Sequence, residues 1–187
     1  MKLDGKYRYV VLCEDAQMKS FIVSFLRSQG IDSRRVFVRN YPCGEGCGEA
    51  FVRKEYLREV TLLRTMNYIR SVLVVCTDAD NKTVEQRAKI LDDEITGNIK
   101  KWKRENELII FFIPRRQIET WIRFLHGEVV DEDMRFIHSG NPVSCKKEAN
   151  QFALFCQDEI ELDIRDITSL QIAKNEYIRV CSLQRNS

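Results

Sequence analysis

The sequence predicts an α/β protein with a mostly parallel central sheet flanked by helices. Short apolar runs of strand length alternate with longer segments in which apolar residues recur at helical spacing. The most apolar runs, at residues 72–76 and 108–114, are hydrophobic throughout, which is typical of strands buried between two layers of helices. A chain of 187 residues is long enough for one main domain with one core.

The first elements read as a βαβ unit. Residues 7–13 include the apolar tract YVVLC and predict the first strand. Apolar side chains at helical spacing over residues 18–27, followed by Gly30 as a helix C-cap, predict the first helix. Residues 35–38 predict a second, short strand.

A glycine-rich loop is expected next, at residues 41–48, before a helix over residues 51–69. Its three glycines could let backbone amides approach a phosphate, but a surface loop is favoured because the lysine of a P-loop motif is missing. Cys43 and Cys47 in this loop are the only close cysteine pair. A lone C-x3-C pair lacks the second pair of ligands that a structural zinc site needs.

The remaining pattern continues the alternation. Residues 71–77, SVLVVCT, predict the third strand, followed by a charged helix over 83–104. A strand at 108–114 and a helix at 115–125 come next, and residues 146–154 and 163–170 predict closing helices. We therefore expect an α/β domain at residues 1–125 and a C-terminal extension at 126–187 that packs on the same domain.

The composition limits the class of protein. Thirty basic and 28 acidic side chains give a net charge of +2, which neither requires nor excludes a polyanionic partner. No apolar run approaches the roughly 20 residues that span a bilayer, and the first residues contain no signal-peptide core. The odd count of seven cysteines, three of them in apolar stretches, argues against a disulfide framework. We expect a cytoplasmic protein that does not contact the membrane.

Acidic residues follow two of the predicted strands. Glu14 comes directly after the first strand, and Asp78 and Asp80 come directly after the third. Because parallel strands end at the same edge of a sheet, these side chains should converge there. Clustered carboxylates raise one another's pKa unless a cation neutralises them, and Mg²⁺ binds through a few such groups. The alternative interpretation is that Glu14 and Asp78 only end strands and cap helices.

An apolar strand ending in Glu14, a glycine-containing loop and an apolar strand ending in Asp78-Ala79-Asp80 together resemble the TOPRIM domain. This Rossmann-like domain is shared by topoisomerases, bacterial primases and OLD-family nucleases, and the resemblance covers residues 7–125. It implies that Glu14 is an acid/base catalyst or metal ligand. It also implies that Asp78 and Asp80 bind Mg²⁺, or Mn²⁺, during phosphodiester transfer or cleavage.

The OLD-like form of this resemblance adds further candidate residues. Glu119 would supply a fourth carboxylate for a second metal ion, or is a solvated helix residue. Lys147 would meet the scissile phosphate as a catalytic lysine. Arg115, Arg116 and Lys146 would hold the nucleic-acid backbone. A surface lysine pair and a solvent-facing helix start are the alternatives for these basic residues.

These residues lead to a first hypothesis of a Mg²⁺-dependent nuclease, or related nucleic-acid phosphodiester enzyme. The second hypothesis is a non-catalytic TOPRIM-like subunit that binds an ATPase or senses a phage product. The resemblance implies a role in defence against phage or other mobile DNA for either one. A response-regulator receiver is a third option, but its acceptor aspartate would follow Glu14 much sooner than Asp78 does. Whether the chain forms a homo-oligomer is left open.

Overall fold

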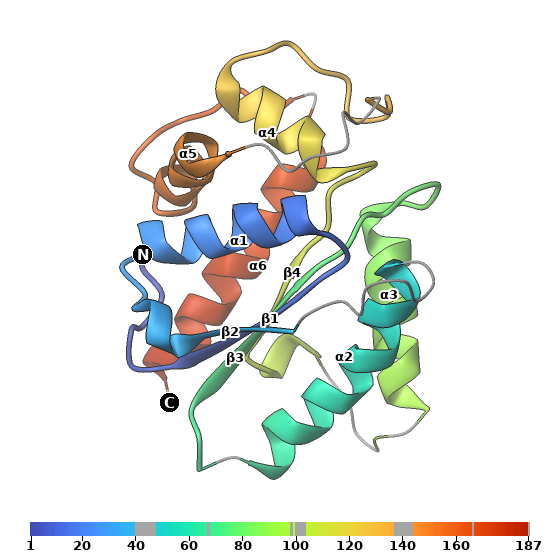
Figure 1. The fold of residues 1–187 in the computed structure, drawn as a ribbon, viewed down its shortest axis with the longest axis vertical. Coiled ribbons are helices and arrows are strands. Elements are labelled where there is room, and N and C mark those ends of the chain that lie inside the picture. The colour runs from blue at the N-terminus through green and yellow to red at the C-terminus, as the bar shows by residue number, and fades with distance from the viewer. Residues whose placement is uncertain are drawn as a thin grey trace.

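The computed structural model of the chain describes residues 1–39, 48–66, 68–97, 99, 104–136, 144–165 and 167–186. These residues form an α/β fold with a four-stranded, all-parallel sheet flanked by α-helices, as Figure 1 shows. The predicted Rossmann-like fold class is therefore confirmed. The strands are β1 (Arg8–Cys13), β2 (Val36–Arg39), β3 (Ser71–Cys76) and β4 (Ile109–Phe112), and they lie in the order β2-β1-β3-β4.

The helices in the described part of the chain are α1 (Ala16–Ser28), α2 (Gly48–Thr65), α3 (Val84–Thr96), α4 (Ile118–His126), α5 (Lys146–Cys156) and α6 (Thr168–Arg185). Short 3-10 turns lie at Ser33–Arg35 and Arg104–Asn106. Helices α1, α4, α5 and α6 cover one face of the sheet, whereas α2 and α3 cover the other (Figure 1). This is the two-layer covering that the apolar strands predict.

Alternate strand residues build two separate cores. Tyr9 and Val11 of β1 point into the larger core, where aromatic rings of α1, β4, α4, α5 and α6 pack together. Val10 and Leu12 point into the smaller core beneath α2 and α3. The larger core is centred on Phe152, whose ring centroid lies 5.2–5.8 Å from those of Phe21, Phe25, Phe112 and Trp121.

Local signals fix where the helices begin and end. The Asp15 side chain accepts a hydrogen bond from the backbone N–H of Met18 at 2.8 Å and so caps α1. Thr83 and Gln86 form a reciprocal capping box at the start of α3. Helix α3 ends at Thr96 with Gly97 as its C-cap, whereas the sequence predicted a helix to residue 104. Residues 98 and 100–103 of that prediction lie outside the described residues. The loop predicted at residues 41–48 lies outside the described residues up to residue 47, including Cys43 and Cys47, and its last residue, Gly48, begins α2.

The C-terminal segment packs against the sheet domain itself. Residues of α5 and α6 share the larger core with α1 and β4. The sequence predicted a closing helix only for residues 163–170, whereas α6 extends from Thr168 to Arg185. Its buried side chains Leu170, Ala173, Tyr177 and Cys181 recur at spacings of three and four, so the helical signal was present beyond residue 170.

None of the helices in the described ranges is long and apolar enough to cross a membrane.

Candidate acidic site

The carboxyl ends of β1 and β3 bring the acidic residues together. The two strands pair in parallel with Cys13 opposite Cys76, so Glu14 and Thr77 are the next residues on neighbouring strands. The Thr77 hydroxyl donates a hydrogen bond to the Glu14 carboxylate. Asp78 follows, and the backbone N–H of Ala79 donates to the carbonyl of Pro114 at 2.8 Å, which ties this turn to the end of β4.

Glu14 and Asp78 are held in surroundings that disfavour their charged forms. Burial raises the pKa of Glu14 to about 7, although the Thr77 hydroxyl and the Arg87 guanidinium oppose the rise. Burial also raises the pKa of Asp78 well above its usual range, and Glu14 adds to the effect as the nearest like charge. The Asp78 side chain is half-buried as a whole. Its Oδ1 atom is enclosed and has no hydrogen-bond partner among the described residues.

Asp80 has different surroundings. Its backbone adopts a left-handed conformation with φ of 56°, which turns the chain after the strand. Its carboxylate accepts hydrogen bonds from Arg87 Nη2 at 3.2 Å and from Arg135 Nη2 at 2.7 Å. Arg87 is 3% exposed and also pairs with Glu49 at 2.6 Å. Two guanidinium groups therefore compensate the charge of Asp80.

Arg115 and Arg116 hold the turn that carries Asp80. Arg116 Nη1 donates to the Asp80 carbonyl at 2.8 Å and to the Asn81 side chain at 2.5 Å. Arg115 donates to the carbonyls of Asp80 and Lys82. Both predicted nucleic-acid contacts thus have partners within the protein, and their binding to nucleic acid stays a prediction.

The other predicted residues differ in how close they lie to the acids. Glu119, in the first turn of α4, is close enough for its charge to raise the pKa of Asp78. Lys146 and Lys147 are exposed at the start of α5. Within the described ranges, no hydrogen bond or ion pair links either lysine to Glu14, Asp78 or Asp80. The structure therefore gathers the four predicted carboxylates but not the lysines.

Helix α2 begins directly against Glu14. A Cβ atom on Gly48 would lie 2.5 Å from the Glu14 carbonyl oxygen and 3.0 Å from the Glu14 Cβ atom. Real Cβ atoms do not approach a backbone oxygen so closely, so only glycine fits here without a shift of the backbone. Gly48 therefore sets how closely the start of α2 approaches the acidic site.

The residues of the acidic site differ in how well they fit a divalent cation. No group of three or more His, Cys, Asp or Glu residues in the described ranges is arranged as a ready metal site. Glu14 and Asp78 nevertheless fit a hard cation, because both are oxygen donors whose charge is poorly compensated and Asp78 Oδ1 has no other partner. Asp80 would become a third ligand if the ion replaced one of the two arginines that bond to its carboxylate.

The site also contains three residues that the sequence did not predict as part of it: Thr77, Arg87 and Gly48. Arg87 gave a signal, because Val84, Arg87, Leu91 and Ile95 form one buried stripe on α3 and an arginine interrupts it. A charged residue at a core position of a helix indicates a buried partner. The contacts of Thr77 and Gly48 depend on tertiary packing and gave no comparable signal.

Comparisons with known proteins give no family. No family model matches the chain, and no curated protein or solved structure is significantly similar to it. The resemblance to TOPRIM domains therefore stays a prediction that depends on Glu14, Asp78 and Asp80.

Proposed function

We propose that this protein is a metal-dependent phosphodiester enzyme acting on nucleic acid, with Mg²⁺ or Mn²⁺ held by Glu14, Asp78 and Asp80. The observation that supports the proposal is the pair Glu14 and Asp78, two half-buried carboxylates with raised pKa values at the carboxyl ends of adjacent strands. Sites in open parallel sheets form at this edge. Strongly perturbed pKa values of neighbouring acids are characteristic of functional sites.

The residues have distinct roles in this proposal. A bound divalent ion would polarise a phosphoryl oxygen and neutralise developing charge. When it is not a ligand of the ion, Glu14 has a pKa of about 7 and can hold or accept a proton near neutral pH, as an acid/base group must. Arg115 and Arg116 keep the Asp80 turn in place, and Glu119 adds a fourth acid near Asp78.

The test is cleavage of plasmid DNA, single-stranded DNA and tRNA with Mg²⁺ or Mn²⁺. Asp78→Asn and Asp80→Asn are each expected to lower the rate about 100-fold or more, because a metal ligand supports several kcal/mol of charge stabilisation. Asp93→Asn is the matched control, since Asp93 is 60% exposed on α3 and, in the described part of the chain, forms an ion pair only with Lys89. Retained cleavage in both site variants would rule out this function.

A non-catalytic subunit is the second candidate, and one observation favours it. Arg87 and Arg135 already neutralise Asp80, as expected of a turn stabilised by arginines rather than by metal. In this case the chain would bind an ATPase partner, and the complex would survive Asp78→Asn and Asp80→Asn. A catalytic subunit loses its activity in the two variants. A non-catalytic subunit keeps its complex with the partner in both variants, and a pull-down with wild-type and variant chains measures this.

A further inference from the structure

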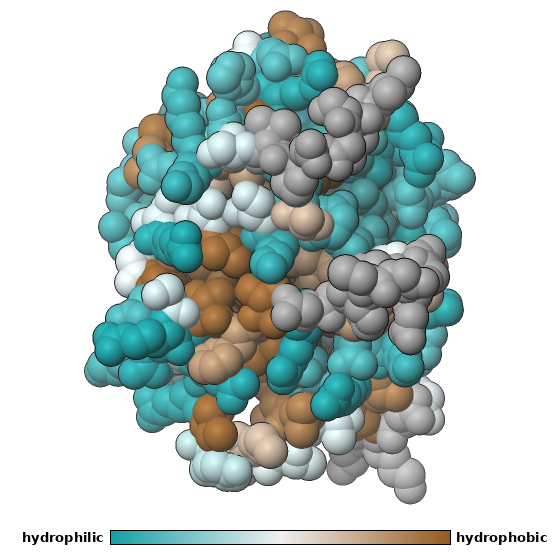
Figure 2. All heavy atoms as spheres, in the orientation of Figure 1, coloured by the Kyte–Doolittle hydropathy of each residue, from teal (hydrophilic) through white to brown (hydrophobic). Residues whose placement is uncertain are grey.

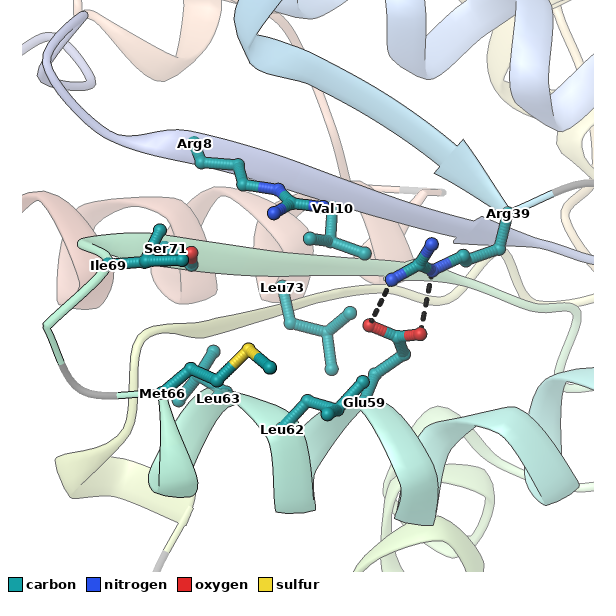
Figure 3. Close-up of a pocket in the computed structure, with 10 residues that line it drawn as sticks. All are labelled: Arg8, Val10, Arg39, Glu59, Leu62, Leu63, Met66, Ile69, Ser71 and Leu73. Carbon is teal, nitrogen blue, oxygen red and sulfur yellow. Dashed lines mark hydrogen bonds and ion pairs between the residues drawn. The ribbon is translucent and has the colours of Figure 1, made fainter.

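A cavity of about 210 Å³ lies between helix α2 and the sheet, away from the acidic pair. Figure 3 shows that Leu63 and Met66 reach into it from α2 and its end, while Val10 and Leu73 form its floor on β1 and β3. These walls are apolar. Hydrophobic residues also gather on this side of the molecule, around β2, within a hydrophilic surround (Figure 2).

Charged groups close the two ends of the cavity. At one end Arg39 of β2 forms a two-pronged ion pair with Glu59 of α2, at 2.6 and 3.0 Å (Figure 3). At the other end lies Arg8, the first residue of β1. Its Nε atom is buried without a hydrogen-bond partner among the described residues, and its guanidinium lies 4.0 Å from the centre of the Phe37 ring.

Arg8 also lines a second, adjoining hollow of about 500 Å³ at the amino end of the sheet. Arg34 and Arg35 line this hollow with Phe37. Asp32 neutralises Arg34 at 2.8 Å, but within the described ranges no carboxylate pairs with Arg8 or Arg35. The hollow is therefore positively charged. The Arg8 Nε atom, a donor without a hydrogen-bond partner among the described residues, lies where this hollow meets the apolar cavity.

We propose that Arg8 joins the two hollows into a binding site for a nucleotide. The base enters the apolar cavity, where the Arg39–Glu59 pair offers donors and acceptors to its edge, and the phosphate lies in the hollow between Arg8 and Arg35. An arginine guanidinium forms paired hydrogen bonds with phosphate oxygens, which gives Arg8 Nε the partner it lacks. The cavity is smaller than the roughly 300–1,000 Å³ of drug-sized sites, so a single-ring base is preferred.

This site is independent of the proposed cleavage. Its distinctive part, Arg8 and the basic hollow, lies at the amino end of the sheet, whereas Glu14 and Asp78 lie at the carboxyl end. Binding therefore needs neither divalent metal nor an intact acidic site. Asp78→Asn protein in EDTA should bind nucleotide as tightly as wild type, so failure of either proposal can be recognised separately.

The experiment is isothermal titration calorimetry in EDTA with UMP, AMP, uridine, inorganic phosphate and a short 5′-phosphorylated oligonucleotide. UMP is expected to bind more tightly than AMP, and at least about tenfold more tightly than uridine, which lacks the charged hydrogen-bond acceptor. Binding of UMP alone identifies a free nucleotide as the ligand, and equal binding of the oligonucleotide identifies a strand end. Phosphate binding as tight as that of UMP, or no binding of UMP at all, overturns the proposal.

Two variants test the two halves of the site. Arg8→Gln removes the orphaned donor and its charge and should weaken UMP binding about tenfold or more. Leu63→Phe fills the apolar cavity, so UMP binding should be lost while the thermal midpoint stays equal or rises. Arg58→Gln, on the exposed side of α2 with its side chain 67% exposed, is the control for lost charge. Unchanged UMP binding in both test variants would overturn the assignment.

Discussion

Two clusters of half-buried carboxylates in this protein have pKa values that are shifted in opposite directions. At the edge of β4, burial alone would raise the pKa of Glu176, but Arg104 and Arg179 outweigh it and the pKa is lowered. Arg104 Nη1 lies 2.6 Å from the Glu176 carboxylate and Arg179 Nη2 lies 3.0 Å from it. At the carboxyl ends of β1 and β3, burial prevails and the pKa values of Glu14 and Asp78 are raised.

The two clusters differ in the partners of their carboxylates and not in how deeply the carboxylates are buried. Arg179 also donates to the backbone carbonyls of Glu107 and Ile109, so the β4 cluster protects the free edge of the sheet. Within the described residues, no arginine forms an ion pair with Glu14 or Asp78, since Arg87 bonds to Asp80 and Glu49 and acts on Glu14 only from a distance. A fully paired cluster indicates a structural role, whereas a poorly compensated one indicates a site kept for a ligand.

The largest expected effect comes from breaking the paired cluster. Arg179→Met should lower the free energy of unfolding by about 3 kcal/mol, because it weakens the compensation of buried Glu176 and leaves backbone carbonyls unsatisfied. Urea denaturation measures the change. Arg123→Met is the control, because Arg123 and Glu128 form an exposed pair and its loss should cost less than about 0.5 kcal/mol.

The second effect comes from adding a divalent cation. Mg²⁺ at about 100 times its dissociation constant should stabilise the wild-type protein by roughly 2.7 kcal/mol. Asp78→Asn should abolish this gain, and Arg179→Met should leave it unchanged. Thermal melts with and without Mg²⁺ provide the measurement, and equal shifts in wild type and Asp78→Asn would contradict the comparison.

The third effect is an increase in stability when an acidic side chain is replaced by its neutral amide. Without metal at neutral pH, Asp78→Asn should raise the free energy of unfolding by about 2 kcal/mol, because it removes a half-buried carboxyl group whose ionisation is opposed by burial and whose Oδ1 has no hydrogen-bond partner among the described residues. Glu176→Gln should do the opposite, since it removes the charge that Arg104 and Arg179 bind. If denaturation of both variants shows destabilisation, the acidic pair is structural.

The smallest effect is a dependence of stability on pH. The pKa of Glu14 is about 7 in the folded protein against a usual 4.5, so the folded state binds more protons than the unfolded state between these values. The metal-free protein should therefore lose about 1–2 kcal/mol as the pH rises from 4.5 to 7. Glu14→Gln should flatten this part of the curve. An unchanged slope in Glu14→Gln would show that other groups cause it.

The sequence predicted the sheet and the acidic edge because both depend on local signals. Apolar runs predicted all four strands, and the residues that follow β1 and β3 predicted which acids would meet. Sequence could not reveal that Asp80 would pair with Arg87 and Arg135, 7 and 55 positions away, since this depends on how α3 and the later chain pack. Distant partners of this kind decide which carboxylates stay uncompensated.

Helix α6 shows in another way why local sequence patterns do not predict every element in full. The predicted helix at residues 163–170 missed most of α6, because charged residues such as Lys174, Glu176 and Arg179 weaken its apolar stripe. These residues are satisfied by ion pairs with Asp158 and Arg104 and by the β4 edge. Polar residues with buried partners thus resemble solvent-facing ones until the fold is known.

Helix α6 also sets an order of events for the growing chain. Its Tyr177 hydroxyl donates to the Met1 carbonyl at 2.6 Å, and its Gln184 accepts from the backbone N–H of Asp4 at 3.1 Å. Met1 and Asp4 therefore cannot make these native contacts until residues 177–184 have been synthesised. Such distant contacts slow folding, so β1 exposes apolar surface during synthesis. Chaperone dependence in the cell is the expected consequence of this closure.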